Sequence, residues 1–146
     1  QGRGRGVAFT YSFGSYAAQV IDVAVANGNV TVERVVTVVD CGLAVSPKSV
    51  VAQIEGGTVY GLSAALFGNI TLRNGRVEQS NFHDYRVLTM IEVPVFDTHI
   101  VPSTEAPAGI GEVSTVVTAP ALFNAVFAAT GKRLRRQPLA SENLRE

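Results

Sequence analysis

The chain has 146 residues, of which 47% are hydrophobic and 16% are charged. This balance predicts one globular domain over residues 1–146 with a substantial apolar core, and it excludes a disordered tail. Twelve basic and twelve acidic residues cancel, so no overall field would attract nucleic acid or an anionic membrane surface. Cys41 is the only cysteine, which excludes an internal disulfide framework and a zinc site built from paired cysteines.

The sequence predicts neither a membrane-spanning segment nor a signal peptide. No apolar stretch approaches the roughly 20 residues that span a bilayer, and the Gly/Arg-rich start lacks the apolar core of a signal peptide. We therefore expect no membrane insertion, and the compartment, cytoplasmic or periplasmic, stays open. The chain begins without Met, as a piece of a longer polypeptide would.

The first predicted elements are two strands. β-branched residues dominate residues 20–25 and 30–39, with Asn27-Gly28 between them, which is a strong signal for an antiparallel hairpin. The second run is apolar at nearly every position from Val35 to Val39. This pattern predicts a central strand that is buried on both faces.

A helix is predicted next, from Ser46-Pro47 to Phe67, because an N-cap residue followed by proline begins helices. Three glycines in its interior, at 56, 57 and 61, each cost about 1 kcal/mol relative to alanine. We expect the close approach of another backbone or of a ligand to compensate.

The remaining elements are shorter. Asn74-Gly75 predicts a hairpin over residues 70–77, residues 98–101 resemble a short strand, and Thr118-Ala119-Pro120 predicts the start of a second helix that ends at Gly131. The predicted fold class is therefore α+β, a mostly antiparallel sheet with two main helices packed on it.

Two segments are candidates for a functional site. In Gly109-Ile110-Gly111-Glu112 the glycines would allow turns that aim a carboxylate into a cavity, although Glu112 could also simply begin a helix. In the segment from Gln53 to Gly57, an amide beside two glycines could bind an extended polar ligand. Alternatively, this helix packs tightly on the sheet through its glycines, and Gln53 and Glu55 are solvated.

Other polar residues favour structural roles. His83 and Asp84 are adjacent on a segment expected to be extended, so their side chains should point to opposite faces and not pair. Cys41 is expected to be a small core residue. The glycines at 2, 4 and 6 do not predict a nucleotide site, because no strand precedes them and no helix follows.

Four segments occur in one order: Val39-Asp40-Cys41-Gly42, residues 52–57, residues 81–85, and Gly109-Ile110-Gly111-Glu112. Together they resemble the C-terminal part of the molybdopterin-binding subunit in the isoquinoline 1-oxidoreductase and aldehyde dehydrogenase branch of the xanthine oxidase family of molybdenum hydroxylases. The resemblance covers about residues 2 to 139 and only the last part of that family's large subunit.

The resemblance implies roles for three residues. Glu112 would be the catalytic base beside molybdenum, and Gln53 and Gly111 would contact the molybdopterin-type cofactor, with no metal ligand from the chain itself. The family's usual Pro-Gly or Pro-Pro after the glutamate is replaced here by Val113-Ser114.

The resemblance also implies a reaction and partners. The complete enzyme would oxidise an aldehyde or N-heterocycle with water as the oxygen source. Its partners would be the remainder of the large subunit and an iron–sulfur electron-transfer subunit on another chain, because one cysteine cannot hold a cluster. The isolated chain is expected to be inactive, without tightly bound cofactor, and able to self-associate through an exposed apolar surface.

A second hypothesis stays open from the sequence. The chain could be a non-catalytic α+β interaction module, or a detached fragment, descended from that subunit.

Overall fold

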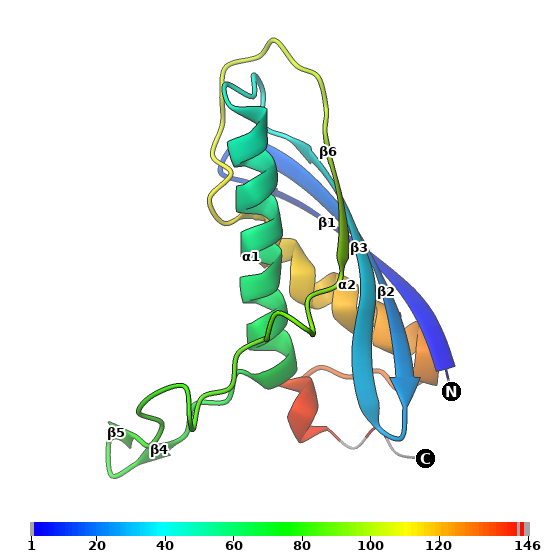
Figure 1. Cartoon of the computed structure of the whole chain (residues 1–146), viewed down its shortest axis with the longest axis vertical. Coiled ribbons are helices and arrows are strands. Elements are labelled where there is room, and N and C mark those ends of the chain that lie inside the picture. Colours follow the sequence, from blue (N-terminus) through cyan, green and yellow to red (C-terminus); the bar gives the residue numbers. More distant parts are fainter. Residues whose placement is uncertain (1, 143, 145–146) are drawn as a thin grey trace.

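The computed structural model describes residues 2–142 and 144, and it shows the expected α+β architecture (Figure 1). Its elements in chain order are β1 (Gly2–Ser12), β2 (Ser15–Ala26), β3 (Asn29–Asp40), α1 (Pro47–Phe67), β4 (Leu72–Arg73), β5 (Arg76–Val77), β6 (Val95–Ile100), α2 (Val113–Thr130) and a 3-10 turn (Leu139–Ser141).

The main sheet has four strands in the order β1-β2-β3-β6. The first three are antiparallel neighbours, whereas β6 pairs with β3 in parallel after a connection that contains α1. The mostly antiparallel sheet and the central place of β3 are therefore confirmed. Strands β4 and β5 form a separate hairpin on an arm, residues 69–94, whose far end projects away from the body (Figure 1).

All three hairpins use a two-residue turn in which both residues have positive φ. The angles are 53° and 80° at Asn27-Gly28, 51° and 75° at Asn74-Gly75, and 56° and 80° at Phe13-Gly14. Such turns match the right-handed twist of paired strands. The two Asn-Gly predictions are confirmed, and the third hairpin was missed because phenylalanine rarely takes this conformation.

Strand β1 was also not predicted, because its first residues alternate glycine with arginine. The face of β1 that carries Gly2, Gly4 and Gly6 packs directly on α2. A Cβ atom on any of these glycines would come within 3.0 Å of a backbone carbonyl oxygen of that helix. Glycine, which disfavours strands in general, is thus required here for close strand–helix packing.

Both helices lie on one side of the sheet, and neither covers the opposite side, which we call the open face (Figure 1). On β3, Val35, Thr37 and Val39 face the helices and are buried, whereas Val38 points to the open face and is 40% exposed. The prediction that β3 is buried on both faces is therefore wrong.

Helix α2 begins at Val113, five residues before the predicted start at Thr118. Val113 and Val117 are buried in a cluster with Ile54 and Val39, so apolar packing extends the helix toward its N-terminus. Pro120 lies inside the helix, where it removes a single backbone hydrogen bond.

The expectation that no segment could span a bilayer needs correction. By length and composition alone, α1 and α2 are long and apolar enough to cross a membrane. The core helices of soluble proteins meet the same criterion, and both helices here pack on the sheet or on each other.

The contact between β1 and α2 gives a stability prediction. Gly4→Ala should lower the free energy of unfolding by about 1–3 kcal/mol, because its Cβ atom would overlap the Ala125 carbonyl oxygen. The matched control is Gly56→Ala, whose Cβ atom would meet nothing within 4 Å and which should stabilise the helix by about 0.5–1 kcal/mol. Urea denaturation of both variants measures the difference, and equal effects would refute the packing explanation.

Candidate functional site

The middle of α1 and the N-terminal half of α2 meet through small residues. A Cβ atom on Gly57 would come within 3.0 Å of Ser114 Oγ, and one on Gly61 would lie 2.9 Å from the Cβ atom of Thr118. Thr115 Oγ1 also donates a hydrogen bond to the Gly57 carbonyl oxygen at 2.9 Å. The expected close approach of another backbone is confirmed at Gly61, where the Thr115 carbonyl oxygen would lie 3.2 Å from the added Cβ atom. Side chains of α2 approach Gly57 instead, and nothing lies within 4 Å of a Cβ atom added at Gly56.

A buried glutamine on β2 joins both helices to the sheet. Gln19 Nε2 donates to Thr58 Oγ1 on α1 at 2.7 Å. The hydroxyl of Thr118 on α2 lies 3.0 Å from Gln19 Oε1 and 2.7 Å from the Ser114 carbonyl oxygen. All three side chains are fully buried. Leaving a polar group buried this deeply without a partner is costly, so the contact favours these positions of both helices relative to β2.

One hydrogen bond joins the two segments that the sequence singled out. Gln53 Nε2, on α1, donates to the Gly111 carbonyl oxygen at 2.8 Å across 58 residues of sequence. The rest of the Gln53 amide, its oxygen and second hydrogen, has no partner among the described residues. Gln53 is exposed, so these groups are accessible to a ligand.

Glu112 follows Gly111 directly and is the N-cap residue of α2. Its side chain makes no capping hydrogen bond, and its carboxylate has no partner within the described part of the chain. The interpretation of Glu112 as a helix-start residue is thus correct for its position. Glu112 is exposed, however, so the dry cavity expected around a general base is not formed by this chain alone.

Backbone contacts hold the loop that leads to Glu112. The Ala108 N–H donates to the Cys41 carbonyl oxygen at 2.9 Å, and the Gly109 N–H donates to the Phe13 carbonyl oxygen at 3.0 Å. Neither Gly109 nor Gly111 has a positive φ, so the expected glycine-dependent turns are absent. A Cβ atom on Gly109 would crowd Phe13, whereas one on Gly111 would meet nothing within 4 Å.

These residues fit an organic polar cofactor better than a directly ligated metal. Gly111 leaves open space where a side chain would otherwise lie, and the Gln53 amide offers one donor and one acceptor. Within residues 2–142 and 144, no group of three or more His, Cys, Asp or Glu could hold a metal ion. A cofactor that brings its own metal is compatible with this arrangement.

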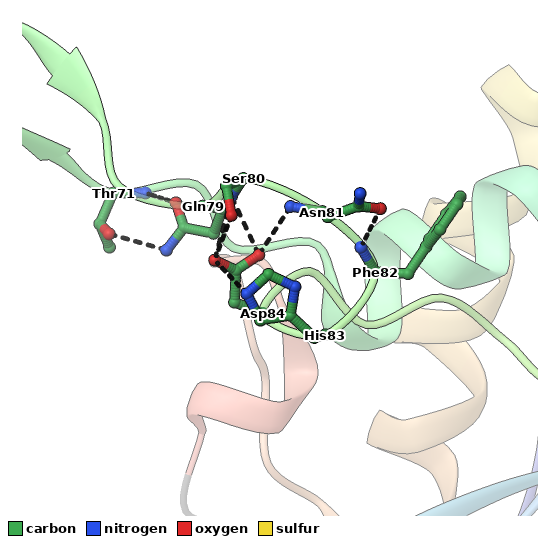
Figure 2. A network of polar contacts seen from close by, with 7 residues as sticks. All are labelled: Thr71, Gln79, Ser80, Asn81, Phe82, His83 and Asp84. Atoms are coloured by element: carbon green, nitrogen blue, oxygen red, sulfur yellow. Dashed lines mark hydrogen bonds and ion pairs between the residues drawn. The ribbon is translucent and has the colours of Figure 1, made fainter.

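The sequence reasoning was wrong about His83 and Asp84. Residues 80–85 form turns rather than an extended segment, and His83 Nε2 lies 3.5 Å from Asp84 Oδ2. Figure 2 shows the Asp84 carboxylate accepting hydrogen bonds from the backbone N–H groups of Ser80 and Asn81. Phe82 points away from this network (Figure 2). The expected structural role of this pair remains a prediction.

Cys41 behaves as the sequence suggested. It is 3% exposed and packs in the core cluster beside Val39 and Val113. Burial raises the pKa of the Cys41 thiol, and the neighbouring Asp40 carboxylate raises it further. A thiol with a raised pKa is a poor nucleophile at neutral pH.

Comparison with known proteins identifies the family. The molybdopterin cofactor-binding domain model matches residues 1–94. The chain belongs to this family. It is 41% identical over 112 residues (77% of the chain and 14% of the relative) to a protein named membrane-bound aldehyde dehydrogenase [pyrroloquinoline-quinone] from Gluconacetobacter polyoxogenes. It is 36% identical over 140 residues (94% of the chain and 18% of the relative) to isoquinoline 1-oxidoreductase subunit beta from Brevundimonas diminuta.

Solved structures agree with this assignment. The aldehyde oxidoreductase from Desulfovibrio desulfuricans superposes with a TM-score of 0.78 at 26% identity, over 89% of this chain and 15% of that one. The chain therefore spans less than a fifth of the length of each of these three proteins. Its homologues include xanthine oxidase family molybdenum hydroxylases, as the resemblance implied.

The turn at residues 80–85 gives a pH prediction. Hydrogen bonds from the backbone N–H groups of Asn81 and Ser80 lower the pKa of Asp84. Because the pKa of Asp84 is lower in the folded chain than in the unfolded chain, its ionised carboxylate stabilises the fold at any pH above the ordinary pKa of aspartate. This stabilisation is lost as the pH falls through the lowered pKa of the folded chain. An NMR titration should show the Ser80 and Asn81 amide signals shifting together below that ordinary value. A transition at the ordinary value would contradict the network.

Proposed function

We propose that this chain is part of the cofactor-binding subunit of a molybdenum-dependent hydroxylase. In this proposal the complete enzyme oxidises an aldehyde or an N-heterocycle with water as the oxygen source. Glu112 is its catalytic base, and Gln53 and Gly111 contact the molybdopterin-type cofactor.

The observation that carries the proposal is the hydrogen bond between Gln53 and Gly111. It joins a ligand-accessible amide to the residue before a carboxylate that has no partner among the described residues. A base must reach the reacting proton before its strength matters, and a carboxylate committed to a salt bridge could not do so. The family match and the names of the relatives support the same hypothesis, a cofactor-binding subunit of a molybdenum hydroxylase.

The chain contributes a positioned proton acceptor. When bound, the cofactor supplies the redox chemistry of the oxidation. The Glu112 carboxylate would accept the proton released during that step, held at the start of α2 by the loop contacts to Phe13 and Cys41. A general base of this kind contributes about 10²–10⁴-fold to the rate.

The proposed partners follow from what this chain lacks. Electron transfer through an iron–sulfur cluster requires several thiolates, whereas Cys41 is the only cysteine and is buried. The cluster would therefore lie outside these 146 residues. We place it on a companion subunit, because several relatives are themselves named as subunits. The remainder of the large subunit is the second proposed partner.

The proposal predicts different defects for the two site residues in the complete enzyme. Glu112→Gln should lower kcat by roughly a hundredfold or more, the range for loss of a general base, while molybdenum and pterin content stay at the wild-type level. Gln53→Leu should lower the cofactor content instead, because it removes the free amide groups. Metal analysis and steady-state kinetics on the same preparations separate the two effects.

Two results would contradict the assignment. A wild-type kcat in Glu112→Gln would remove this residue from the mechanism. Purification of the wild-type chain from its own host with neither metal, pterin nor larger companion chains would favour the non-catalytic module. The isolated chain should itself show no aldehyde turnover, because the other walls of the site are absent from it.

A further inference from the structure

The open face of the sheet carries a continuous apolar area. Cross-strand neighbours form rows across it: Phe9 pairs with Ala18, which pairs with Val38, and Val7 pairs with Val20, which pairs with Val36. The large hydrophobic side chains exposed on this face include Val7, Phe9, Tyr11, Tyr16 and Val38. Scattered exposed apolar residues are normal in proteins, but a contiguous patch of them marks an interaction site.

Aromatic residues dominate one end of this area. The rings of Phe9 and Tyr16 stack with centroids 6.0 Å apart, and those of Tyr11 and Tyr16 lie 4.5 Å apart. Aromatic side chains are enriched in the cores of protein interfaces, where they bury a large area at a low cost in conformational entropy.

Charged groups at the other end are paired with one another. Arg5 Nε on β1 lies 2.6 Å from Asp22 Oδ1 on β2. Arg34 Nη2 on β3 lies 2.6 Å from Asp97 Oδ2 on β6. An apolar centre beside a neutralised polar border is the usual anatomy of an interface. No excess charge of one sign on this border would oppose a neutral polypeptide surface.

The aromatic end of the face adjoins the candidate site. Phe13, in the turn after Tyr11, accepts the hydrogen bond from Gly109 in the loop that leads to Glu112. Phe13 is itself 59% exposed. The aromatic end of the open face therefore lies next to the loop that leads to Glu112.

We propose that the open face binds the part of the cofactor-binding subunit that this chain does not span, and that this contact helps to enclose Glu112. The inference rests on the proposed function. Its occupant follows from two facts: the chain aligns with only 14% and 18% of the two curated relatives described above, and Glu112 is exposed although a base needs a site shielded from water. A second copy of this chain would cover the face without supplying the missing walls.

Single cysteines test the proposal without any need for turnover. Phe9→Cys and Val38→Cys place a thiol on two different strands of the open face, and Thr31→Cys places one at an exposed position on β3 outside the apolar rows. Native Cys41 is buried and its pKa is raised, so it should contribute little background. Circular dichroism confirms the fold of each variant before labelling with a maleimide.

The expected result is a difference between two forms of the protein. In the 146-residue chain, at a concentration at which sedimentation velocity shows a monomer, the thiols at positions 9 and 38 should react as fast as the control at position 31. In the complete subunit purified from its host, those at 9 and 38 should react at least about tenfold more slowly, as expected for the water-excluding core of an interface. The control should stay reactive.

Two outcomes would overturn the proposal. Equal labelling of positions 9 and 38 in both forms would show that the face stays open. Protection of positions 9 and 38 in the complete subunit only at concentrations at which sedimentation velocity shows it to dimerise would assign the face to self-association. The catalytic role of Glu112 can fail independently of the docking surface. If Glu112→Gln keeps the wild-type kcat while positions 9 and 38 are protected, the residue is not the base but the open face is still a docking surface.

Discussion

The buried amide of Gln19 is the contact on which the arrangement of this chain depends. It bonds to Thr58 on α1 and lies within hydrogen-bonding distance of Thr118 on α2, and an unpaired amide in that position would cost about 1–3 kcal/mol. The two helices can therefore pack on the sheet in few ways other than the one observed. Glycines 57 and 61 then allow α2 to approach α1 closely. Gln53 lies five residues before Thr58, and Glu112 lies six residues before Thr118, so the same contact helps to bring the two segments of the candidate site together.

The chain supplies one side of a site rather than a closed pocket. Its helices cover one face of the sheet, and the residues proposed to act on cofactor and substrate lie at the start of those helices, exposed. The opposite face presents aromatic and β-branched side chains. Our proposal gives both features the same physical explanation. The rest of the subunit would bury these surfaces, and they are exposed in the 146-residue chain.

Much of the fold follows from local sequence signals, and its exceptions have physical causes. The Asn-Gly turns and the Ser46-Pro47 helix start are local signals that tertiary packing did not override. Strand β1 could not be predicted because its glycines are selected by the backbone of α2, a contact distant in sequence. The start of α2 was misplaced because the burial of Val113 and Val117 outweighs the signal at Thr118-Pro120. For the candidate site, resemblance predicted Gln53 and Glu112, and this prediction is still untested. Periodicity could not reveal that Gln53 bonds to Gly111 or that Gln19 connects the helices.

The most direct test of this account is a double-mutant cycle between Gln19→Leu and Thr118→Val, with the free energy of unfolding measured by urea denaturation. If the buried amide joins the sheet to α2, the two changes should be non-additive, with a coupling energy of about 0.5–3 kcal/mol. The corresponding cycle with Thr58→Val should give a coupling in the same range for α1. Additivity within about 0.3–0.5 kcal/mol in both cycles would contradict the claim that Gln19 fixes the two helices that carry the site.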